Sequence, residues 1–345
     1  MRYNIQDLNA QGDCIKIYLN CICNMCMSGV GKKQIISVTP DLIEDILPPR
    51  LISSRKGDNG IVLVIGGSGI YHGAPLLSSL AALRAGVDLV YTATPKSNVS
   101  AIRSSSPNII VLPFPDDEFT LASAKSVLKM LPKKPQVTAI GMGMKIASPA
   151  ALVYIIKELI KIESKLVLDA SALVPEVIES ISGTNTIVTP HPGEYKRMFQ
   201  EPHNHNKMSS AGQTQTTRDA LQEHASNVCS IAKKYGITII LKGYYNIICD
   251  GHITVGQQKR TAVIKRTTPA MTVGGCGDVL SGVVAGLFSK LSDAFYASIG
   301  GVYLTGMAGS LAHKKLGLHM VPTDLIEQLP NAMKSFDKVI FNSEQ

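Results

Sequence analysis

Short apolar runs rich in β-branched residues alternate along most of the chain with longer segments whose apolar residues recur at helical spacing. The short runs predict buried strands at Ile61–Ile65, Leu89–Thr94, Ile109–Leu112, Val137–Ile140, Leu166–Leu168, Thr186–Val188 and Thr238–Leu241. The helical segments are Ala74–Ala85, Leu121–Leu131, Ala150–Ile160 and Arg218–Tyr235. This alternation predicts an α/β fold, with a central, mostly parallel sheet covered by helices on both faces.

The two ends of the chain depart from this alternation. A short helix is predicted over Val38–Arg50, with Thr39 as its cap. Residues Asn246–Val255 predict a hairpin at one sheet edge, with a type I′ turn at Asp250-Gly251. Three successive helices are expected after it, over Asp278–Leu291, Phe295–Lys314 and Thr323–Met333.

Composition narrows the classes of function. No linker, repeat or charge block divides residues 35–340, which we interpret as one domain behind a poorly ordered leader, residues 1–34. The net charge of +8 comes from scattered basic residues, and a chain with no Trp and only 7 Phe lacks the aromatic positions of single-strand binders, which argues against nucleic acid as a partner. No apolar run reaches the roughly 18 residues of a membrane helix, and no secretory signal is visible, so we expect a cytoplasmic protein without a membrane partner.

The cysteines do not predict a metal site. Seven cysteines, an odd number in a chain without a secretory signal, predict reduced thiols. The leader holds four of them, Cys14, Cys21, Cys23 and Cys26, but no His lies nearby and their spacing matches no zinc knuckle.

A glycine-rich turn followed by an acid carries the strongest chemical signal. Gly274-Gly275-Cys276-Gly277-Asp278 opens an apolar helix. The glycines allow successive backbone N–H groups to point inward, and the helix N-terminus adds partial positive charge. The sequence therefore predicts an anion hole for a phosphate, formed by Gly274, Gly275, Cys276 and Gly277. Asp278 would lie beside the phosphoryl group, and capping of the helix is the structural alternative for this residue.

Other predicted strand ends also carry glycine or polar groups. The loop Gly66-Gly67-Ser68-Gly69 follows a strand, with neither the Rossmann spacing nor the Gly-Lys-Ser/Thr of a P-loop. Two prolines bracket His191, which favours a ligand contact over a solvated turn. Further strands end at Gly141-Met142-Gly143, at Asp169 and at Lys242, whose ammonium is available to phosphate. Ligands of open α/β sheets bind at this edge, so together the loops predict a binding site.

These blocks resemble those of the ADP- or ATP-dependent NAD(P)H-hydrate dehydratases, members of the ribokinase-like carbohydrate-kinase family. The similarity covers Ile35–Met333 and rests on K-G-x-x-G with V-I-G-G-S, on T-P-H-P-G-E, on L-K-G and on G-G-x-G-D-V-L-S-G. It implies a three-layer αβα fold and a lyase that repairs NADH or NADPH whose nicotinamide ring has been hydrated. It also implies Mg²⁺, ADP or ATP as co-substrate, and a homo-oligomer.

The resemblance also implies a role for each matching position. Asp278 would be the general base, and it would bind the hydrated dinucleotide together with Ala74, Gly143 and His191. The adenine nucleotide would contact Lys242, Gly243, Tyr244, Tyr245, Asn246 and Gly277. Departures from the usual family residues include Met142 in place of Pro, Ser171 in place of a carboxylate and Thr305 in place of His.

The implied reaction explains why such parts occur together. Hydroxide is a poor leaving group, whereas a phosphorylated ring hydroxyl leaves as phosphate when the ring nitrogen expels it; the phosphoryl transfer needs positioning and charge neutralisation. One alternative is a small-molecule kinase of the thiazole or pyrimidine type, and another is a nucleotide sensor without turnover. The T-P-H-P-G-E block favours the dehydratase over the kinase, and Asp278 argues against a sensor, which needs no base. The lack of a fused epimerase domain favours ADP over ATP.

Overall fold

A ten-stranded sheet forms the centre of the molecule, with the strand order β1-β11-β10-β9-β8-β7-β6-β3-β4-β5. The computed structural model describes residues 35–200, 218–252 and 260–341, so the predicted leader lies outside the described residues. The strands are β1 (Ile35–Ile36), β3 (Ile61–Ile65), β4 (Leu89–Pro95), β5 (Ile110–Phe114), β6 (Val137–Ile140), β7 (Lys165–Leu168), β8 (Thr186–Val188), β9 (Thr238–Leu241), β10 (Tyr245–Cys249) and β11 (Thr261–Lys265). Neighbouring strands run parallel except at β10, which is antiparallel to both β9 and β11. The predicted α/β fold with a mostly parallel sheet is confirmed.

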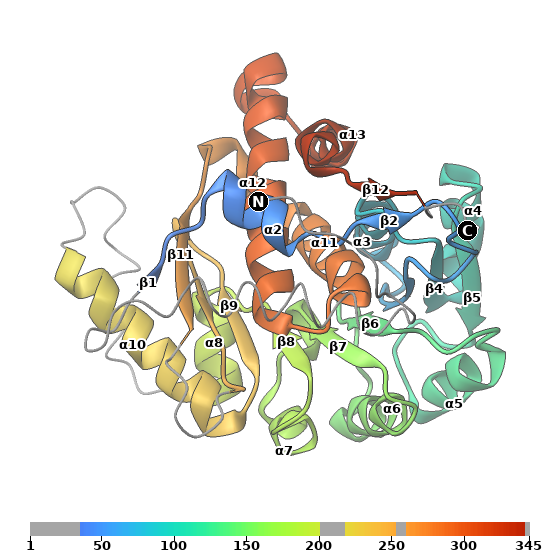
Figure 1. Ribbon diagram of the computed structural model, residues 1–345. Helices are drawn as coiled ribbons and strands as arrows, with labels where there is room; N and C mark the ends of the chain where they lie inside the picture. Colours follow the sequence, from blue (N-terminus) through green and yellow to red (C-terminus); the bar gives the residue numbers. More distant parts are fainter. Residues whose placement is uncertain (1–34, 201–217, 253–259, 342–345) are drawn as a thin grey trace.

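Each face of the sheet packs against its own set of helices (Figure 1). Val62 and Val64 of β3 belong to one core, and Ile61, Leu63 and Ile65 belong to the other, because successive strand residues point to opposite faces. The first face carries α2 (Pro40–Ile46), α3 (Gly73–Arg84), α11 (Cys276–Lys290), α12 (Ala294–Leu316) and α13 (Pro322–Met333). The second carries α5 (Leu121–Met130), α6 (Pro149–Lys161), α7 (Ile178–Ile181), α8 (Pro192–Phe199) and α10 (Arg218–Tyr235). The result is the three-layer αβα arrangement.

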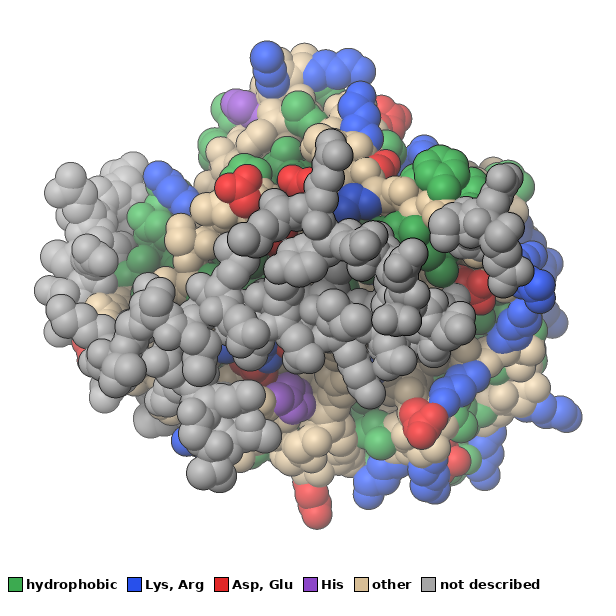
Figure 2. Space-filling view, viewed as in Figure 1, with side chains coloured by type: hydrophobic (Ala, Val, Ile, Leu, Met, Phe, Trp, Pro, Cys, Tyr) green, Lys and Arg blue, Asp and Glu red, His purple; other side chains and the backbone are tan. Residues whose placement is uncertain are grey.

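Two smaller parts complete the described chain. Helix α4 (Val99–Ser105) packs on α3 in a small core of its own, and β2 (Arg50–Leu51) pairs in parallel with β12 (Val339–Ile340). No helix among the described residues is long and apolar enough to cross a membrane. On the face shown in Figure 2, Lys and Arg side chains lie at several separate places on the described surface.

The predicted hairpin exists, but its turn was wrongly placed. Strand β10 ends at Cys249 and pairs with β11, with Cys249 opposite Thr261, so the chain does not reverse at Asp250-Gly251. Asp250 is instead held by Arg260, whose Nε donates to Asp250 Oδ2 at 2.8 Å. A Cβ on Gly251 would lie 2.1 Å from the carbonyl oxygen of Ala232. Glycine is therefore required there for the close approach of α10, a contact that local turn signals do not reveal.

The prediction of reduced thiols was wrong for two cysteines. Cys229 of α10 and Cys249 of β10 form a disulfide, with their Cα atoms 5.1 Å apart. Cys276 is a free, buried cysteine, and the cysteines of the leader lie outside the described residues. Since 20 residues separate the bonded pair, only the packing of α10 on the sheet brings the two sulfur atoms together.

Helix α11 is held tightly at its middle and at its end. A Cβ on Gly282 would lie 2.1 Å from the carbonyl oxygen of Ser78 in α3, so the two helix backbones approach as closely as glycine permits. At the helix end, Lys165 Nζ donates to Leu291 O at 2.7 Å and also to Phe288 O. Burial lowers the pKa of Lys165 to about 8. These contacts fix the helix along its axis, and its first turn therefore lies at the carboxyl edge of the sheet.

We predict that Gly282→Ala lowers the unfolding free energy by about 1–3 kcal/mol, because the added methyl group forces α11 away from α3. Urea unfolding followed by circular dichroism measures this change. The matched control is Gly73→Ala at the start of α3, where a Cβ would meet no atom within 4 Å. Equal stability of Gly282→Ala and the wild-type protein would show that the helices can separate without cost.

Candidate active site

The loops after β7, β8 and β9 lie beside the first turns of α11, through Asp169, Thr189 and Lys242. Gly67 N donates to Met142 O at 2.8 Å, which joins the loop after β3 to the loop after β6. Lys242 N donates to Pro190 O at 2.8 Å, which joins the loops after β8 and β9. The sequence placed functional groups on these strand ends, and the structure brings the ends together at one edge of the sheet.

The glycine turn leads directly into α11. Gly275 is the N-cap, with φ 101°, and a Cβ there would lie 2.8 Å from Pro322 Cγ and 2.9 Å from Leu77 Cδ1. Both the backbone conformation and the close neighbours therefore require glycine. Cys276 N donates to Val273 O at 3.3 Å, so this amide closes the turn. Of the four predicted anion-hole residues, Cys276 thus has its N–H group already engaged.

Asp278 lies in the first turn of α11 and does not cap the helix. The cap residue is Gly275, and no side chain makes a capping hydrogen bond there. Burial raises the pKa of Asp278 to about 7, with a further rise from Asp169 and Glu194 that Lys242 opposes. A carboxyl group with this pKa can accept a proton near neutral pH, which is the property required of a general base.

Lys242 is surrounded by carboxylates. Its Nζ lies 2.7 Å from Asp169 Oδ1 and 3.9 Å from Glu194 Oε2. A Cβ on Gly277 would lie 3.4 Å from the same Nζ, so the ammonium group also borders the first turn of α11. Burial alone would lower the pKa of Lys242, but Asp169, Glu194 and Asp278 together raise it. The lysine that was predicted to be available to phosphate is therefore a charged group already paired with Asp169.

The T-P-H-P-G-E block forms a helix cap around His191. The ring Nδ1 of His191 accepts from Gly193 N at 3.0 Å, and Glu194 Oε2 accepts from His191 N at 2.8 Å. The His191 side chain is 56% exposed, whereas Glu194 is buried. The prediction weighed a ligand contact against a solvated turn, and the structure adds a third role, capping of α8.

The predicted substrate residues Ala74 and Gly143 are neighbours. Gly143 has φ 63°, and a Cβ there would lie 2.9 Å from both the Cβ of Ala74 and the Cβ of Tyr71. Met142 is fully buried in the core, so this departure from the usual family residue does not alter the surface of the site. Lys145 points to an ion pair with Glu118, at 2.5 Å.

The predicted nucleotide residues other than Gly277 lie on the connection from β9 to β10 and at the start of β10. Gly243 N donates to Asn246 Oδ1 at 3.4 Å, and Asn246 Nδ2 donates to Ile264 O of β11 at 3.3 Å. The rings of Tyr244 and Tyr245 are edge to face, with their centroids 4.9 Å apart. Lys242, Gly243 and Tyr244 form the connection, Tyr245 and Asn246 begin β10, and Lys242 borders Gly277.

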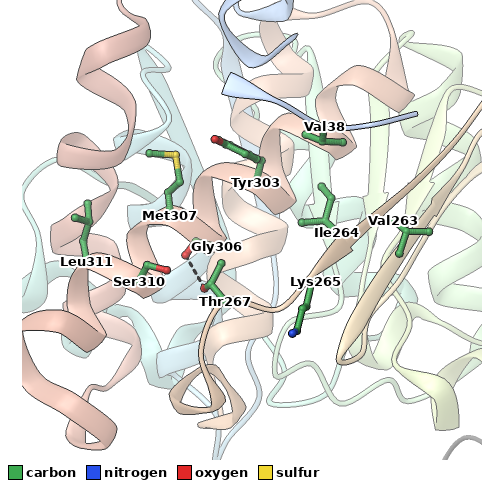
Figure 3. A pocket seen from close by; sticks show the side chains of 10 residues that line it. All are labelled: Val38, Val263, Ile264, Lys265, Thr267, Tyr303, Gly306, Met307, Ser310 and Leu311. Carbon is green, nitrogen blue, oxygen red and sulfur yellow. Dashed lines mark hydrogen bonds between the residues drawn. The ribbon is translucent and has the colours of Figure 1, made fainter. Parts of the chain in front are cut away.

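A pocket of about 470 Å³ adjoins this connection, and the sequence did not predict it. Figure 3 shows that most of the lining residues come from β11 and α12, with one residue before α2 and one after β11: Val38, Val263, Ile264, Lys265, Thr267, Tyr303, Gly306, Met307, Ser310 and Leu311. Lys265 Nζ lies 5.2 Å from the centroid of the Tyr244 ring, which connects the pocket wall to the predicted nucleotide loop.

Sequence reasoning gave no role to two further residues of the site. Ser281 Oγ donates to Asp169 Oδ2 at 2.5 Å, although 112 residues separate them. Glu194 was noted only as part of a motif, yet its carboxylate faces Lys242. The position of Ser281 one helical turn after Asp278 was a usable signal, because residues three apart share a helix face.

Solved structures share this fold. The ADP/ATP-dependent NAD(P)H-hydrate dehydratase from Bacillus subtilis, co-crystallized with ATP/Mg²⁺, is 24% identical, with a TM-score of 0.71 over 89% of this chain and 100% of that chain. A ribokinase-like superfamily protein from Enterococcus faecalis is 22% identical, with a TM-score of 0.69 over 90% of this chain and 99% of that chain. The ribokinase-like fold is thereby confirmed.

Sequence relatives are more informative about the family. The carbohydrate-kinase family model described as NAD(P)H-hydrate dehydratase matches residues 62–331. The chain is 44% identical over 304 residues to the ADP-dependent (S)-NAD(P)H-hydrate dehydratase of Nitrosopumilus maritimus. This match covers 88% of this chain and 99% of the relative. It is 42% identical over 299 residues to the protein of the same name from Cenarchaeum symbiosum, and this match covers 87% of this chain and 97% of that protein. The chain therefore belongs to the NAD(P)H-hydrate dehydratase family.

Proposed function

We propose that this protein dehydrates hydrated NADH and NADPH back to the intact dinucleotides and uses ADP to do so. One observation carries the proposal: Asp278 stands in the first turn of α11, with the predicted nucleotide residues joined to it through Lys242 and Gly277. The relatives with 44% and 42% identity are named ADP-dependent (S)-NAD(P)H-hydrate dehydratases, which supports the reaction and the donor.

In the proposed mechanism, Asp278 accepts the proton of the ring hydroxyl as that oxygen attacks the terminal phosphoryl group. Its raised pKa suits this step, because a base works best with a pKa near the working pH. Amides at the start of α11 and Lys242 stabilise the charge of the transferring phosphoryl group. Phosphate then leaves with the C–O bonding electrons, driven by the ring nitrogen, and loss of a proton from the neighbouring ring carbon restores the double bond.

The charges of the site fit a metal-bound nucleotide. Three carboxylates, Asp169, Glu194 and Asp278, face one ammonium group, so phosphates without a counter-ion would be repelled. Within the described residues no group of three His, Cys, Asp or Glu side chains could hold a metal ion alone. Mg²⁺ suits this arrangement, because it commonly binds through one or two carboxylates together with substrate phosphates. Glu194 and Asp278 would be its nearest protein ligands, and it would neutralise phosphate charge.

We place the adenine base in the pocket between β11 and α12. Its volume is in the range of small-molecule sites, and its lining is mostly apolar, as a planar base requires. Asn246 and Tyr244 of the predicted nucleotide loop contact the pocket wall at Ile264 and Lys265. A nucleotide held here would direct its phosphates towards Lys242 and Gly277. A cytoplasmic location and a homo-oligomeric state stay predictions.

Asp278→Asn should lower turnover by at least about 100-fold, because the amide cannot accept the hydroxyl proton. The assay follows the return of dihydronicotinamide absorbance from hydrated NADH, with ADP or ATP in separate arms. Nucleotide affinity, measured by calorimetry without Mg²⁺, should change by less than about threefold, since Lys242 and the amides at the start of α11 remain. The control is Asp41→Asn, the same change on the exposed surface of α2.

The same assay separates the alternatives. A kinase would consume nucleotide and accumulate a phosphorylated dinucleotide without recovery of absorbance, and a sensor would bind nucleotide without consuming it. Retention of more than a few per cent of the rate by purified Asp278→Asn would remove this residue from the role of base.

Ser310→Trp tests the base pocket. Ser310 lies on the exposed side of the lining, so an indole there should fill the pocket without disturbing the core. We expect the KM for ADP to rise about tenfold or more, with kcat at saturating ADP within about twofold of wild type. The control is Ser230→Trp, an exposed serine of α10. An unchanged KM would place the base elsewhere.

A further inference from the structure

The turn from Ser68 to Tyr71 follows β3, at the edge of the sheet where the candidate active site lies. Ser68 N donates to Tyr71 O and Tyr71 N donates to Ser68 O, both at 3.2 Å. Tyr71 packs against the predicted substrate residues, because a Cβ on Gly143 would lie 2.9 Å from the Cβ atoms of both Tyr71 and Ala74. The turn therefore borders the part of the site that was predicted to bind the hydrated dinucleotide.

The hydroxyl group of Ser68 is buried and has no hydrogen-bond partner. Ser68 is 1% exposed. In the described part of the chain, five buried side-chain polar atoms lack a partner, and they belong to Ser68, Ser78, Thr238, His252 and Thr305. The other four lie within α3 or α12, or at the opposite edge of the sheet, at the start of β9 and after β10. Ser68 alone of this set lies in a loop at the edge where open α/β sheets bind ligands.

This missing partner points to a ligand. A buried hydroxyl without a partner disfavours folding, because it gives up hydrogen bonds to water and gains none in return. Buried polar groups in proteins nearly always have a partner, so an exception beside a binding site indicates that the partner comes from outside the chain.

Asn98 holds the turn from the side of β4. Its side chain is buried, and its Nδ2 donates to Ser68 O at 3.0 Å and to Thr94 Oγ1 at 3.4 Å. A Cβ on Gly67 would lie 2.7 Å from Thr94 Oγ1 and 3.0 Å from Asn98 Nδ2, so the loop packs directly on this pair. Asn98 is the N-cap of α4, yet its side chain makes no capping hydrogen bond there. The amide group therefore fixes the backbone of Ser68 instead of capping α4.

The surroundings of the turn favour an uncharged ligand group over a phosphate. The N–H groups of residues 66–68 already donate to carbonyl groups of the protein, so they are not available to a phosphate. Asp117 adds negative charge, since a Cβ on Gly69 would lie 3.0 Å from its Oδ2. Ile70 and Tyr71 are 76% and 57% exposed and offer apolar surface in the same turn. A hydrated nicotinamide ring suits this place, because it is uncharged and largely apolar, with a carboxamide that accepts hydrogen bonds.

We propose that Ser68 is a substrate-binding residue, whose hydroxyl group donates a hydrogen bond to the carboxamide oxygen of the hydrated nicotinamide ring. Asn98 is then a positioning residue, which acts through the backbone of Ser68. This inference deepens the proposed function and rests on it for the identity of the ligand.

Ser68→Ala tests the contact by binding as well as by turnover. The binding probe is NADH, which carries the same carboxamide, and its fluorescence is followed with ADP at saturation so that the nucleotide pocket is filled. We expect the affinity for NADH to fall about three- to tenfold, as for the loss of one hydrogen bond. The KM for hydrated NADH should rise by a similar factor, with kcat and the KM for ADP within about twofold of wild type.

Stability separates a binding role from a structural one. Ser68→Ala removes only a hydroxyl without a partner, so its urea midpoint should equal or exceed that of the wild-type protein. The matched control is Ser78→Ala in α3, which removes the same kind of buried, unpartnered hydroxyl away from the turn. Its midpoint should behave in the same way, while its affinity for NADH should stay within about twofold of wild type. A lower midpoint in Ser68→Ala with unchanged NADH affinity would show a purely structural role.

Asn98→Ala tests the positioning through a double-mutant cycle. If Asn98 acts through Ser68, this variant weakens NADH binding, and adding Ser68→Ala to it weakens binding further by less than about twofold. Losses that multiply would show that Asn98 does not act through Ser68. Ser68→Ala alone carries the test of the contact if Asn98→Ala does not fold.

The outcomes distinguish this inference from the proposed function. Unchanged NADH affinity together with an unchanged KM for hydrated NADH in Ser68→Ala would overturn the contact even in an active dehydratase. If the wild-type protein binds NADH but does not dehydrate hydrated NADH, a weaker affinity in Ser68→Ala still supports the contact, and the proposed function alone fails. A wild-type protein that does not bind NADH under these conditions would overturn the inference as well.

Discussion

The placement of α11 against α3 and the sheet is the constraint on which the rest of the structure depends. At Gly282 the helix backbone touches the backbone of α3, and at its end Lys165 holds the last carbonyl groups. Because α11 is held against α3 and at its last carbonyl groups, its first turn lies at one fixed point at the sheet edge. The glycine turn, Asp278 and the nucleotide loop can act together only because that point does not move.

The second feature of the site is a buried excess of negative charge around one lysine. Burying an ion pair gives little net stability, and removing one partner leaves an uncompensated charge at considerable cost. The Lys242–Asp169 pair is therefore better understood through what it does to its neighbours. It keeps a positive charge next to the start of α11, and it leaves Asp278 with a pKa of about 7, which burial has raised.

Most of the fold could be predicted from local sequence patterns. The site, in contrast, depends on contacts between residues that lie far apart in the sequence. Strands such as Ile61–Ile65 and Val137–Ile140 have the predicted bounds, because buried parallel strands are continuous apolar runs. The second strand of the hairpin was missed because its first residue, Thr261, pairs with Cys249 across a longer connection than a two-residue turn, and the disulfide was missed because Cys229 meets Cys249 only after α10 packs on the sheet. His191 shows the limit at the site: its prolines indicated rigidity, but not that its ring caps α8.

The departures from the usual family residues fall where they change packing or charge rather than the shape of the site. Met142 is fully buried and Thr305 is 1% exposed, so both act on the core. Ser171 is different, because its N–H group bonds Gly141 O in the turn that follows Asp169. Two cations border this turn: Lys242, which is shared by Asp169 and Glu194, and Arg197, whose guanidinium group donates to Ala170 O at 3.3 Å. Serine at this position leaves Asp169 as the carboxylate that pairs with Lys242, while Arg197 holds the same turn through the carbonyl groups of Ala170 and Leu173.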